Sequence, residues 1–122
     1  MKQAQPRQDL SKRTKDFALR IIRLYAALPK ATEAQVTGKQ VLRSGTSVAS
    51  NYRAVCLARS RAEFVSRMGV VVEETDETVL WLELLVDTGI VPTKRMANLL
   101  AEANELLKIF SSSQQTAKEF KR

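Results

Sequence analysis

Apolar residues recur every three or four positions along most of the chain, and this spacing is typical of amphipathic helices. The first helix is expected to run from Leu10 or Ser11 to Pro29, because proline stops a helix. Its apolar face holds Phe17, Ile21, Leu24 and Leu28. Residues 1–9 are polar and show no periodicity, so they are expected to form a tail without a role in the fold.

A second helix is expected to begin by about Gly38, or earlier near Thr32, and to continue to about Ala58. Small residues recur along one of its stripes at Ser44, Ser47, Asn51, Ala54 and Ala58. A glycine inside a helix costs roughly 1 kcal/mol relative to alanine. We therefore expect Gly45, together with Ser44, to lie where two helices cross closely.

The third helix has the clearest periodicity in the chain. Ser60 is a candidate N-cap, and Glu63 three positions later completes a capping box. Its apolar seam alternates spacings of four and three through Phe64, Met68, Val71, Thr75, Thr78, Leu82 and Leu85. A second line repeats every seven residues at Val65, Val72, Val79 and Val86. Two apolar lines predict contacts with more than one neighbour, so this helix is expected to be the most buried.

Gly89 ends the third helix, and Pro92 with Thr93 begins the fourth. The core face of the fourth helix holds Met96, Leu99, Leu100, Ala103, Leu106, Leu107 and Phe110. The pattern fades after Phe110, and residues 111–122 are expected to fray or to lack order. Four amphipathic helices joined by short turns predict an all-α, antiparallel, up-down-up-down four-helix bundle, with residues 10–122 as its single domain.

Charge indicates which partners the bundle attracts. The chain has 20 Lys and Arg against 13 Asp and Glu, and residues 1–67 hold 14 of the basic side chains but only 4 acidic ones. Such an excess favours nucleic acid or acidic partners. The residues expected to contact nucleic-acid phosphates are Arg13, Lys15, Arg20, Arg23, Arg43, Arg53 and Arg61.

Each of these assignments has an alternative. The basic residues of the first helix also suit an ordinary solvated face. Arg43, Arg53 and Arg61 fall on one side of the second helix and its continuation, where each can instead pair with a carboxylate of the third helix.

Acidic residues of the third helix are expected to form structural ion pairs rather than a cation site. Glu74 and Glu77 lie three positions apart, in line with Glu63, Arg67 and Trp81. Their expected partners are Arg43 and Arg53 of the second helix, or arginines of a neighbouring subunit. Such pairs fix helix register more than they stabilise the fold, because desolvation offsets much of the attraction.

The sequence offers few residues that could act in catalysis. The chain contains no histidine, which removes histidine metal sites and histidine-based catalytic triads. The lone Cys56 has no histidine to activate it and is interpreted as a packed thiol. We therefore expect a protein that is not an enzyme and holds no metal or cofactor.

The same residues bear on location. Residues 1–9 lack the apolar segment of a signal peptide, and no stretch approaches the ~20 apolar residues that span a bilayer. We expect a cytoplasmic protein with no membrane partner.

A combination of motifs resembles a known family. The matching residues are Gln40, Arg43-Ser44, Thr46-Ser47, Asn51-Tyr52-Arg53, Ser60, Glu63-Phe64, Glu74, Asp76-Glu77-Thr78 and Trp81-Leu82. They resemble the four helix bundle proteins related to those encoded in intervening sequences of bacterial large-subunit ribosomal RNA genes, over about Phe17 to Phe110. Ala54 stands where the family commonly has glutamate, which leaves Arg53 freer or differently paired, and Arg67 replaces the usual lysine.

The resemblance implies a small antiparallel bundle that assembles as a homopentamer in the bacterial cytoplasm and has no established enzymatic activity. A more distant relative, the accessory variability protein of diversity-generating retroelements, implies nucleic acid and a reverse transcriptase as partners. The leading hypothesis is a homo-oligomeric basic scaffold, acting as an accessory factor, that binds RNA or DNA through backbone phosphates. The alternative is a protein-protein interaction module with no direct role in nucleic-acid binding.

Overall fold

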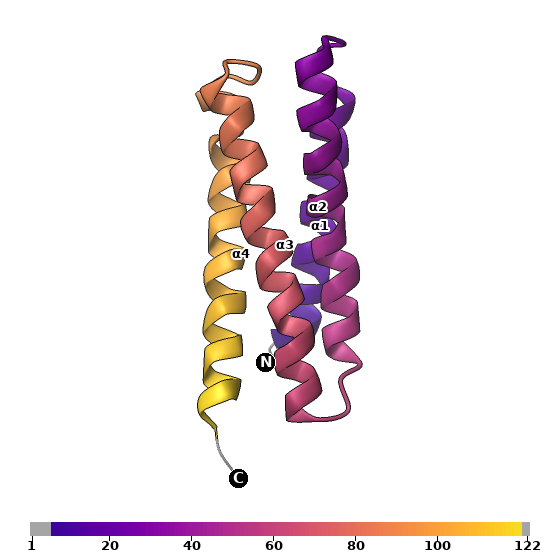
Figure 1. Cartoon of the computed structure of the whole chain (residues 1–122), viewed down its shortest axis with the longest axis vertical. Coiled ribbons are helices and arrows are strands. Elements are labelled where there is room, and N and C mark those ends of the chain that lie inside the picture. The colour runs from indigo at the N-terminus through magenta and orange to yellow at the C-terminus, as the bar shows by residue number, and fades with distance from the viewer. Residues whose placement is uncertain (1–5, 121–122) are drawn as a thin grey trace, which may run out of the picture.

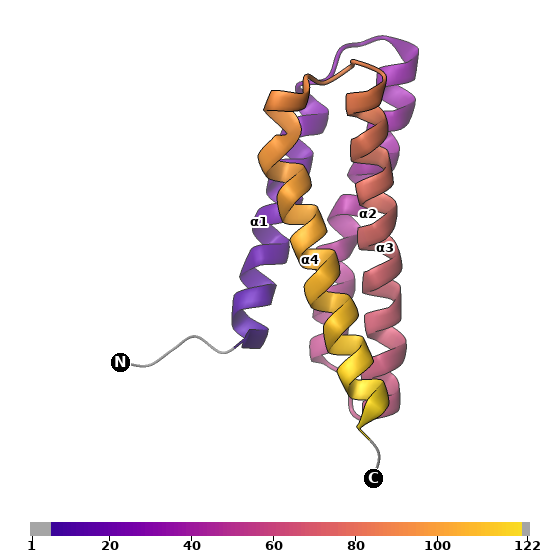
Figure 2. The ribbon, with the colours of Figure 1, turned by 90° about the vertical axis from the view of Figure 1, so that its left-hand side faces the viewer.

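Four helices account for nearly all of residues 6–120, the part of the chain that the computed structural model describes. They are α1 (Pro6–Ala26), α2 (Thr32–Cys56), α3 (Arg61–Asp87) and α4 (Thr93–Glu119). Successive helices run in opposite directions (Figure 1), and each packs mainly on its neighbours in sequence, while the contact that closes the bundle between α1 and α4 is sparse. The start of α1 and the end of α4 lie at the end of the bundle that holds the α2–α3 turn (Figure 2). The predicted all-α four-helix bundle is confirmed.

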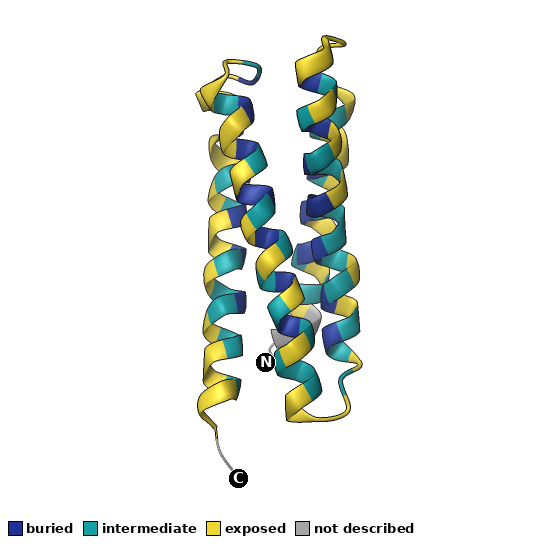
Figure 3. Cartoon of the chain, viewed as in Figure 1, coloured by how far each residue is buried: buried dark blue, intermediate teal, exposed yellow. Residues whose placement is uncertain are grey.

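Buried residues, dark blue in Figure 3, lie where the helices face one another. The largest fully buried side chains are Phe17, Ile21, Met68, Leu82, Leu85, Met96, Leu106 and Phe110. The predicted seam of α3 is buried from Met68 to Leu85, whereas Phe64 at its start is only half-buried. Tyr52 of α2 packs against Phe110 of α4 with ring centroids 5.7 Å apart, so the core extends across the bundle.

Helices α1 and α2 pack closely at Gly45, as the small-residue pattern predicts. A Cβ atom added at Gly45 would lie 2.8 Å from Cγ1 of Ile21, which is too close for ordinary packing. The neighbouring Ser44 is fully buried on the other flank of α2, where its Oγ accepts a hydrogen bond of 2.9 Å from Oγ1 of Thr78 on α3. Small side chains on α2 therefore let it contact α1 and α3 at one level.

The α2–α3 turn reverses the chain fully instead of kinking one long helix. Helix α2 ends at Cys56, and Ser60 caps α3 by accepting a hydrogen bond of 3.0 Å from the Glu63 backbone N–H. The return half of the capping box is shifted by one residue, because Glu63 Oε1 accepts from the backbone N–H of Arg59 at 2.8 Å. The predicted N-cap is confirmed, with its partner carboxylate serving the preceding residue.

Two helix boundaries differ from the sequence-based expectation. Helix α1 begins at Pro6, so residues 6–9 belong to it and the expected tail is shorter; residues 1–5 lie outside the described part. Proline suits the first helical position, and Asp9 in the first turn favours the positive end of the helix dipole. Helix α4 continues to Glu119, because Gln114 packs on α3 and donates a hydrogen bond of 3.1 Å to the carbonyl of Val65.

Candidate functional site

A cluster of ion pairs lies along the outer seam between α2 and α3. Arg43 contacts Glu74 Oε1 at 3.3 Å and also pairs with Glu77. Ser47 Oγ donates to Glu74 at 2.6 Å, and Trp81 Nε1 donates to Glu77 at 3.1 Å. Pairs as exposed as these contribute only ~0–1 kcal/mol each. The cluster mainly aligns the two helices. Within it, the carboxylates of Glu74 and Glu77 neutralise the charge of Arg43.

Arg67 of α3 bonds to the last turn of α2. Its Nη1 donates to the backbone carbonyl of Ala54 at 2.5 Å, and its Nη2 lies 3.5 Å from Glu63. The last carbonyls of a helix have no partner within it, so this arginine caps α2 from α3. Glu63 and Arg67 thus both serve the α2–α3 turn.

Arg13 connects α1 to α4. Its Nη2 lies 2.7 Å from Glu102 Oε1 and 3.2 Å from Glu105 Oε1, and its Nε donates to Glu102 Oε2 at 3.1 Å. The hydrogen bond to Glu102 is the main cause of the raised pKa of Arg13. Two of the expected phosphate contacts, Arg13 and Arg43, are therefore neutralised within the bundle.

Arg61 does not continue a strip with Arg43 and Arg53. The chain reverses before α3, so Arg61 lies at the base of the bundle, with its guanidinium 5.0 Å from the centre of the Phe120 ring. These two side chains line a cavity of about 570 Å³ between the start of α3 and the end of α4. The expected alignment of three arginines on one helix is wrong, because α2 ends at Cys56.

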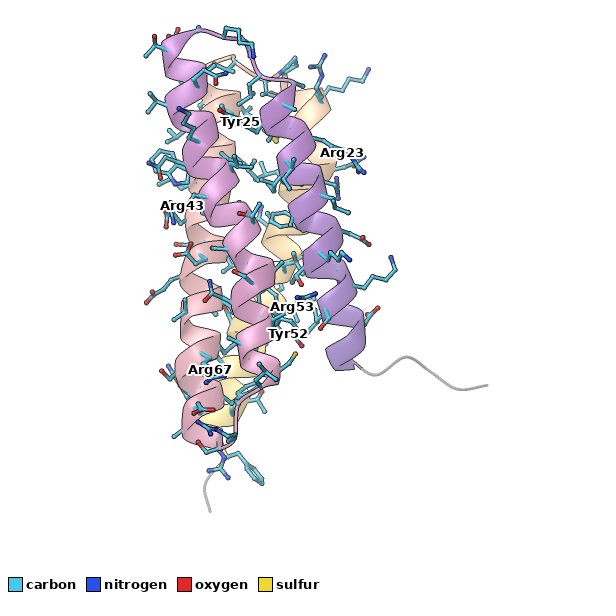
Figure 4. All side chains as sticks on the ribbon, turned by 90° about the vertical axis from the view of Figure 1, so that its right-hand side faces the viewer. Arg23, Tyr25, Arg43, Tyr52, Arg53 and Arg67 are labelled. Atoms are coloured by element: carbon cyan, nitrogen blue, oxygen red, sulfur yellow. The ribbon has the colours of Figure 1, made fainter. Side chains whose placement is uncertain are left out.

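A groove of about 490 Å³, here named the α1–α2 groove, lies between the first two helices. Its lining consists of Ser11, Lys12, Thr14, Lys15, Thr46, Ala49, Ser50 and Arg53. Figure 4 shows Arg53 on the side of α2 that faces α1. Lys12 pairs with Asp16 at 2.9 Å, and this hydrogen bond raises the pKa of Lys12. Lys15 and Arg53 form no ion pair within residues 6–120, so they supply the uncompensated charge of the groove.

A second groove, of about 420 Å³ and here named the α1–α4 groove, lies on the other flank of α1. Its lining consists of Arg20, Arg23, Leu24, Ala27, Leu28, Pro29, Ile90, Val91, Arg95 and Leu99. Arg23 points away from α2 on this side of α1 (Figure 4). Its three arginines are also without an ion-pair partner in the described part of the chain.

The structure thus separates the expected phosphate contacts into three groups. Lys15 and Arg53 meet in the α1–α2 groove, Arg20 and Arg23 line the α1–α4 groove, and the remaining three are engaged elsewhere. Sequence reasoning did not select Arg95, which α4 brings beside the last turn of α1. The predicted antiparallel order could have indicated Arg95, because in such a bundle the start of α4 lies at the same end as the end of α1.

Other chemistry is sparse in residues 6–120. They contain no group of three His, Cys, Asp or Glu side chains placed to hold a metal ion. Cys56 is half-buried, with its Sγ 3.9 Å from the Ser11 hydroxyl. None of the described helices combines the length and the apolar character that crossing a bilayer requires.

Comparison with known proteins places the chain in a family. The model of the 23S rRNA-intervening sequence proteins matches residues 7–112. A crystal structure of a protein with unknown function from the S23 ribosomal protein family of Bacteroides thetaiotaomicron is similar, with 32% sequence identity and a TM-score of 0.82. The similarity covers 89% of this chain and 97% of that one. Comparison with curated proteins gives no match. The chain therefore belongs to the 23S rRNA-intervening sequence protein family.

Proposed function

We propose that this chain is a non-enzymatic, homo-oligomeric scaffold that binds RNA or DNA through backbone phosphates. The observation that carries the proposal is the α1–α2 groove, where Lys15 and Arg53 lie without an ion-pair partner in the described residues and no carboxylate lines the walls. Cationic side chains and hydroxyl groups are the usual protein partners of phosphate oxygens. Because such contacts do not read base edges, the binding has little sequence preference.

The distribution of charge supports this orientation of the nucleic acid. The exposed carboxylates of α3 are Glu73, Asp76, Glu83 and Asp87. Helix α3 packs on α2 and α4, on the opposite side of the bundle from α1. A polyanion is therefore attracted toward α1 and α2 and repelled from α3.

Self-association is supported by the outer face of α3. Val70, Leu80 and Leu84 are 42%, 49% and 36% exposed there. The carboxylates around them make contact between two α3 faces unfavourable, so the next copy must offer a different surface. A contact between unlike surfaces closes into a ring when its rotation permits. The family resemblance implies a ring of five subunits.

A non-catalytic, cytoplasmic role completes the proposal. The sequence has no histidine to act as a general base, and its single cysteine is typical of a reducing compartment. An accessory role fits a protein that offers separate surfaces for nucleic acid and for other protein chains. A protein-interaction module is the function that remains if the bundle assembles but retains no nucleic acid.

The decisive measurement is the salt dependence of binding to a short, labelled, mixed-sequence RNA, followed by fluorescence anisotropy. The log of affinity should fall linearly with log salt, because each neutralised phosphate releases counterions. In the variant with Lys15→Glu and Arg53→Glu, affinity should fall by at least about tenfold and the salt slope by about 1 to 2.

The matched control carries Lys94→Glu and Lys108→Glu on the exposed face of α4, which gives the same change in net charge. Its effect should be much smaller. Affinity that does not change with salt, or an equal loss in both variants, contradicts phosphate binding in the α1–α2 groove.

A further inference from the structure

The α1–α4 groove has a chemistry that phosphate binding does not require. Seven of its lining residues are apolar, namely Leu24, Ala27, Leu28, Pro29, Ile90, Val91 and Leu99. The other three are Arg20, Arg23 and Arg95, which come from two helices. The α1–α2 groove, in contrast, has hydroxyl-bearing or cationic residues at every lining position except Ala49. The two flanks of α1 therefore suit different partners.

The arginines have no sufficient role within the bundle. Arg23 lies in the last turn of α1, where a positive charge stabilises the negative end of the helix dipole. That effect does not account for Arg20 or for Arg95, which is near the positive end of α4. No ion pair within residues 6–120 neutralises any of the three, although like charges repel one another at the rim of one groove.

The chemistry of the groove selects its occupant. A nucleic-acid backbone would bring phosphates to the arginines but no aliphatic side chains to the apolar part of the lining. A fatty acid would bring one carboxylate to three arginines. A peptide with several carboxylates beside leucine-like side chains satisfies both features, because guanidinium groups pair with carboxylates in a two-pronged geometry.

We propose that the α1–α4 groove docks an acidic, leucine-rich amphipathic segment of a partner protein. The aliphatic side chains of that segment cover Leu24, Ala27 and Ile90, which are exposed or half-buried, and its carboxylates pair with the three arginines. This assignment goes beyond nucleic-acid binding and gives Arg20 and Arg23 a protein partner. It also assigns Arg95, which lines the same groove, to this partner.

The test uses a labelled synthetic helical peptide of about 15 residues with leucine and glutamate at helical spacing. Anisotropy measures its affinity for the full chain. Replacing the glutamates by glutamine, or the leucines by serine, should each weaken binding by about tenfold or more, because both the charge pairs and the apolar contacts are needed. Equal binding of the serine peptide means that charge alone attracts it and overturns the proposal.

The protein variants locate the site. Arg23 and Arg95 are both exposed, so the variant with Arg23→Glu and Arg95→Glu is expected to fold, which circular dichroism checks. It should weaken peptide binding by about tenfold or more, while the Lys94→Glu, Lys108→Glu control stays within about twofold of the original chain. An equal loss in the two variants, or no peptide binding by the original chain, overturns the proposal.

Two further measurements separate this inference from the proposed function. Sodium dodecanoate tests the small-ligand alternative, and the proposal fails if dodecanoate fills the groove while no peptide binds. RNA affinity should depend on Lys15 and Arg53 far more than on Arg23 and Arg95. If Arg23→Glu with Arg95→Glu weakens RNA as strongly as Lys15→Glu with Arg53→Glu, the groove belongs to the nucleic-acid surface.

Discussion

Two glycines show how a single side chain sets the distance between helices. Gly45 of α2 faces Ile21, and an added Cβ would lie 2.8 Å from Cγ1 and 2.9 Å from Cγ2 of that residue. Gly69 of α3 faces only the end of the flexible Gln114 side chain, whose Nε2 would lie 3.0 Å from the added atom. The first glycine is required by a close helix contact, and the second is not.

Opposite effects on stability are therefore expected from the same substitution at these two positions. Gly45→Ala should lower the free energy of unfolding by about 1 to 3 kcal/mol, because the added methyl forces α1 and α2 apart. Gly69→Ala should leave it unchanged or raise it by up to about 1 kcal/mol, because alanine is the better helix former and Gln114 can move. Urea denaturation measures both, and destabilisation of equal size would contradict the packing argument.

The sequence predicts the role of Gly45 but not its partner. A glycine inside an apolar, helical pattern is costly, so its presence alone indicates a close contact. That the contact is with Ile21 of α1 depends on which helix lies opposite, and the spacing of residues in one helix does not contain that information. The same limit applies to Arg43, for which the sequence offered both phosphate and the carboxylates of α3 as partners.

Helix ends differ in how they are satisfied. Ser60 caps α3 through its side chain, whereas Ala31 and Pro92, at the starts of α2 and α4, provide no side-chain cap. Helix α3 follows a reversal at residues 57–60, so its start must be well defined. Arg67 adds a second constraint at the same turn by bonding to the carbonyl of Ala54.

Removing the cap should weaken the bundle measurably. Ser60→Ala deletes the acceptor of the Glu63 backbone N–H and should cost about 0.5 to 2 kcal/mol of stability. Ser66→Ala, on the exposed face of the same helix, should be neutral or slightly stabilising, because alanine favours the helical state. Thermal unfolding of the two variants measures the difference, and similar midpoints would show that the cap is dispensable.

At the ends of the bundle, the sequence predicts less. The heptad seam of α3 follows from its spacing, because burial on one side of a helix imposes that period. The last three turns of α4 have no such pattern, and they remain helical because Gln114 and its neighbours pack against the start of α3. Arg95 joins Arg20 and Arg23 for a related reason, since only the assembled bundle brings the start of α4 beside the end of α1.

Basic and acidic side chains lie on different faces of the bundle. Basic side chains without ion-pair partners in the described residues flank α1, and carboxylates cover the outside of α3, where Leu80 and Leu84 are also exposed. Under the proposed function, one face binds polyanions while another contacts a second copy of the chain. The charge excess of residues 1–67 predicts such a division, but the pairing of Arg13 with Glu102 shows that sequence alone overestimates the free charge.

Assembly should depend on the apolar face of α3. The variant with Leu80→Lys and Leu84→Lys should shift the mass measured by light scattering toward that of one chain, because it places charge in the proposed contact. The control Leu57→Lys, at a 72% exposed position in the α2–α3 turn, should leave the assembly intact. A single-chain mass for the original protein at micromolar concentration would refute self-association altogether.

The two grooves lie at different levels of α1 as well as on different flanks, and this spacing lets both be occupied at once. Residues 11–15 line one groove and residues 20–29 line the other. With a rise of about 1.5 Å per residue, the grooves are on the order of 15 Å apart along the helix axis, beyond the screening length of about 8 Å at physiological ionic strength. RNA in one groove and an acidic peptide in the other would therefore repel each other only weakly. At low salt the screening length grows, and by linkage each ligand would then lower the affinity of the other by the same factor.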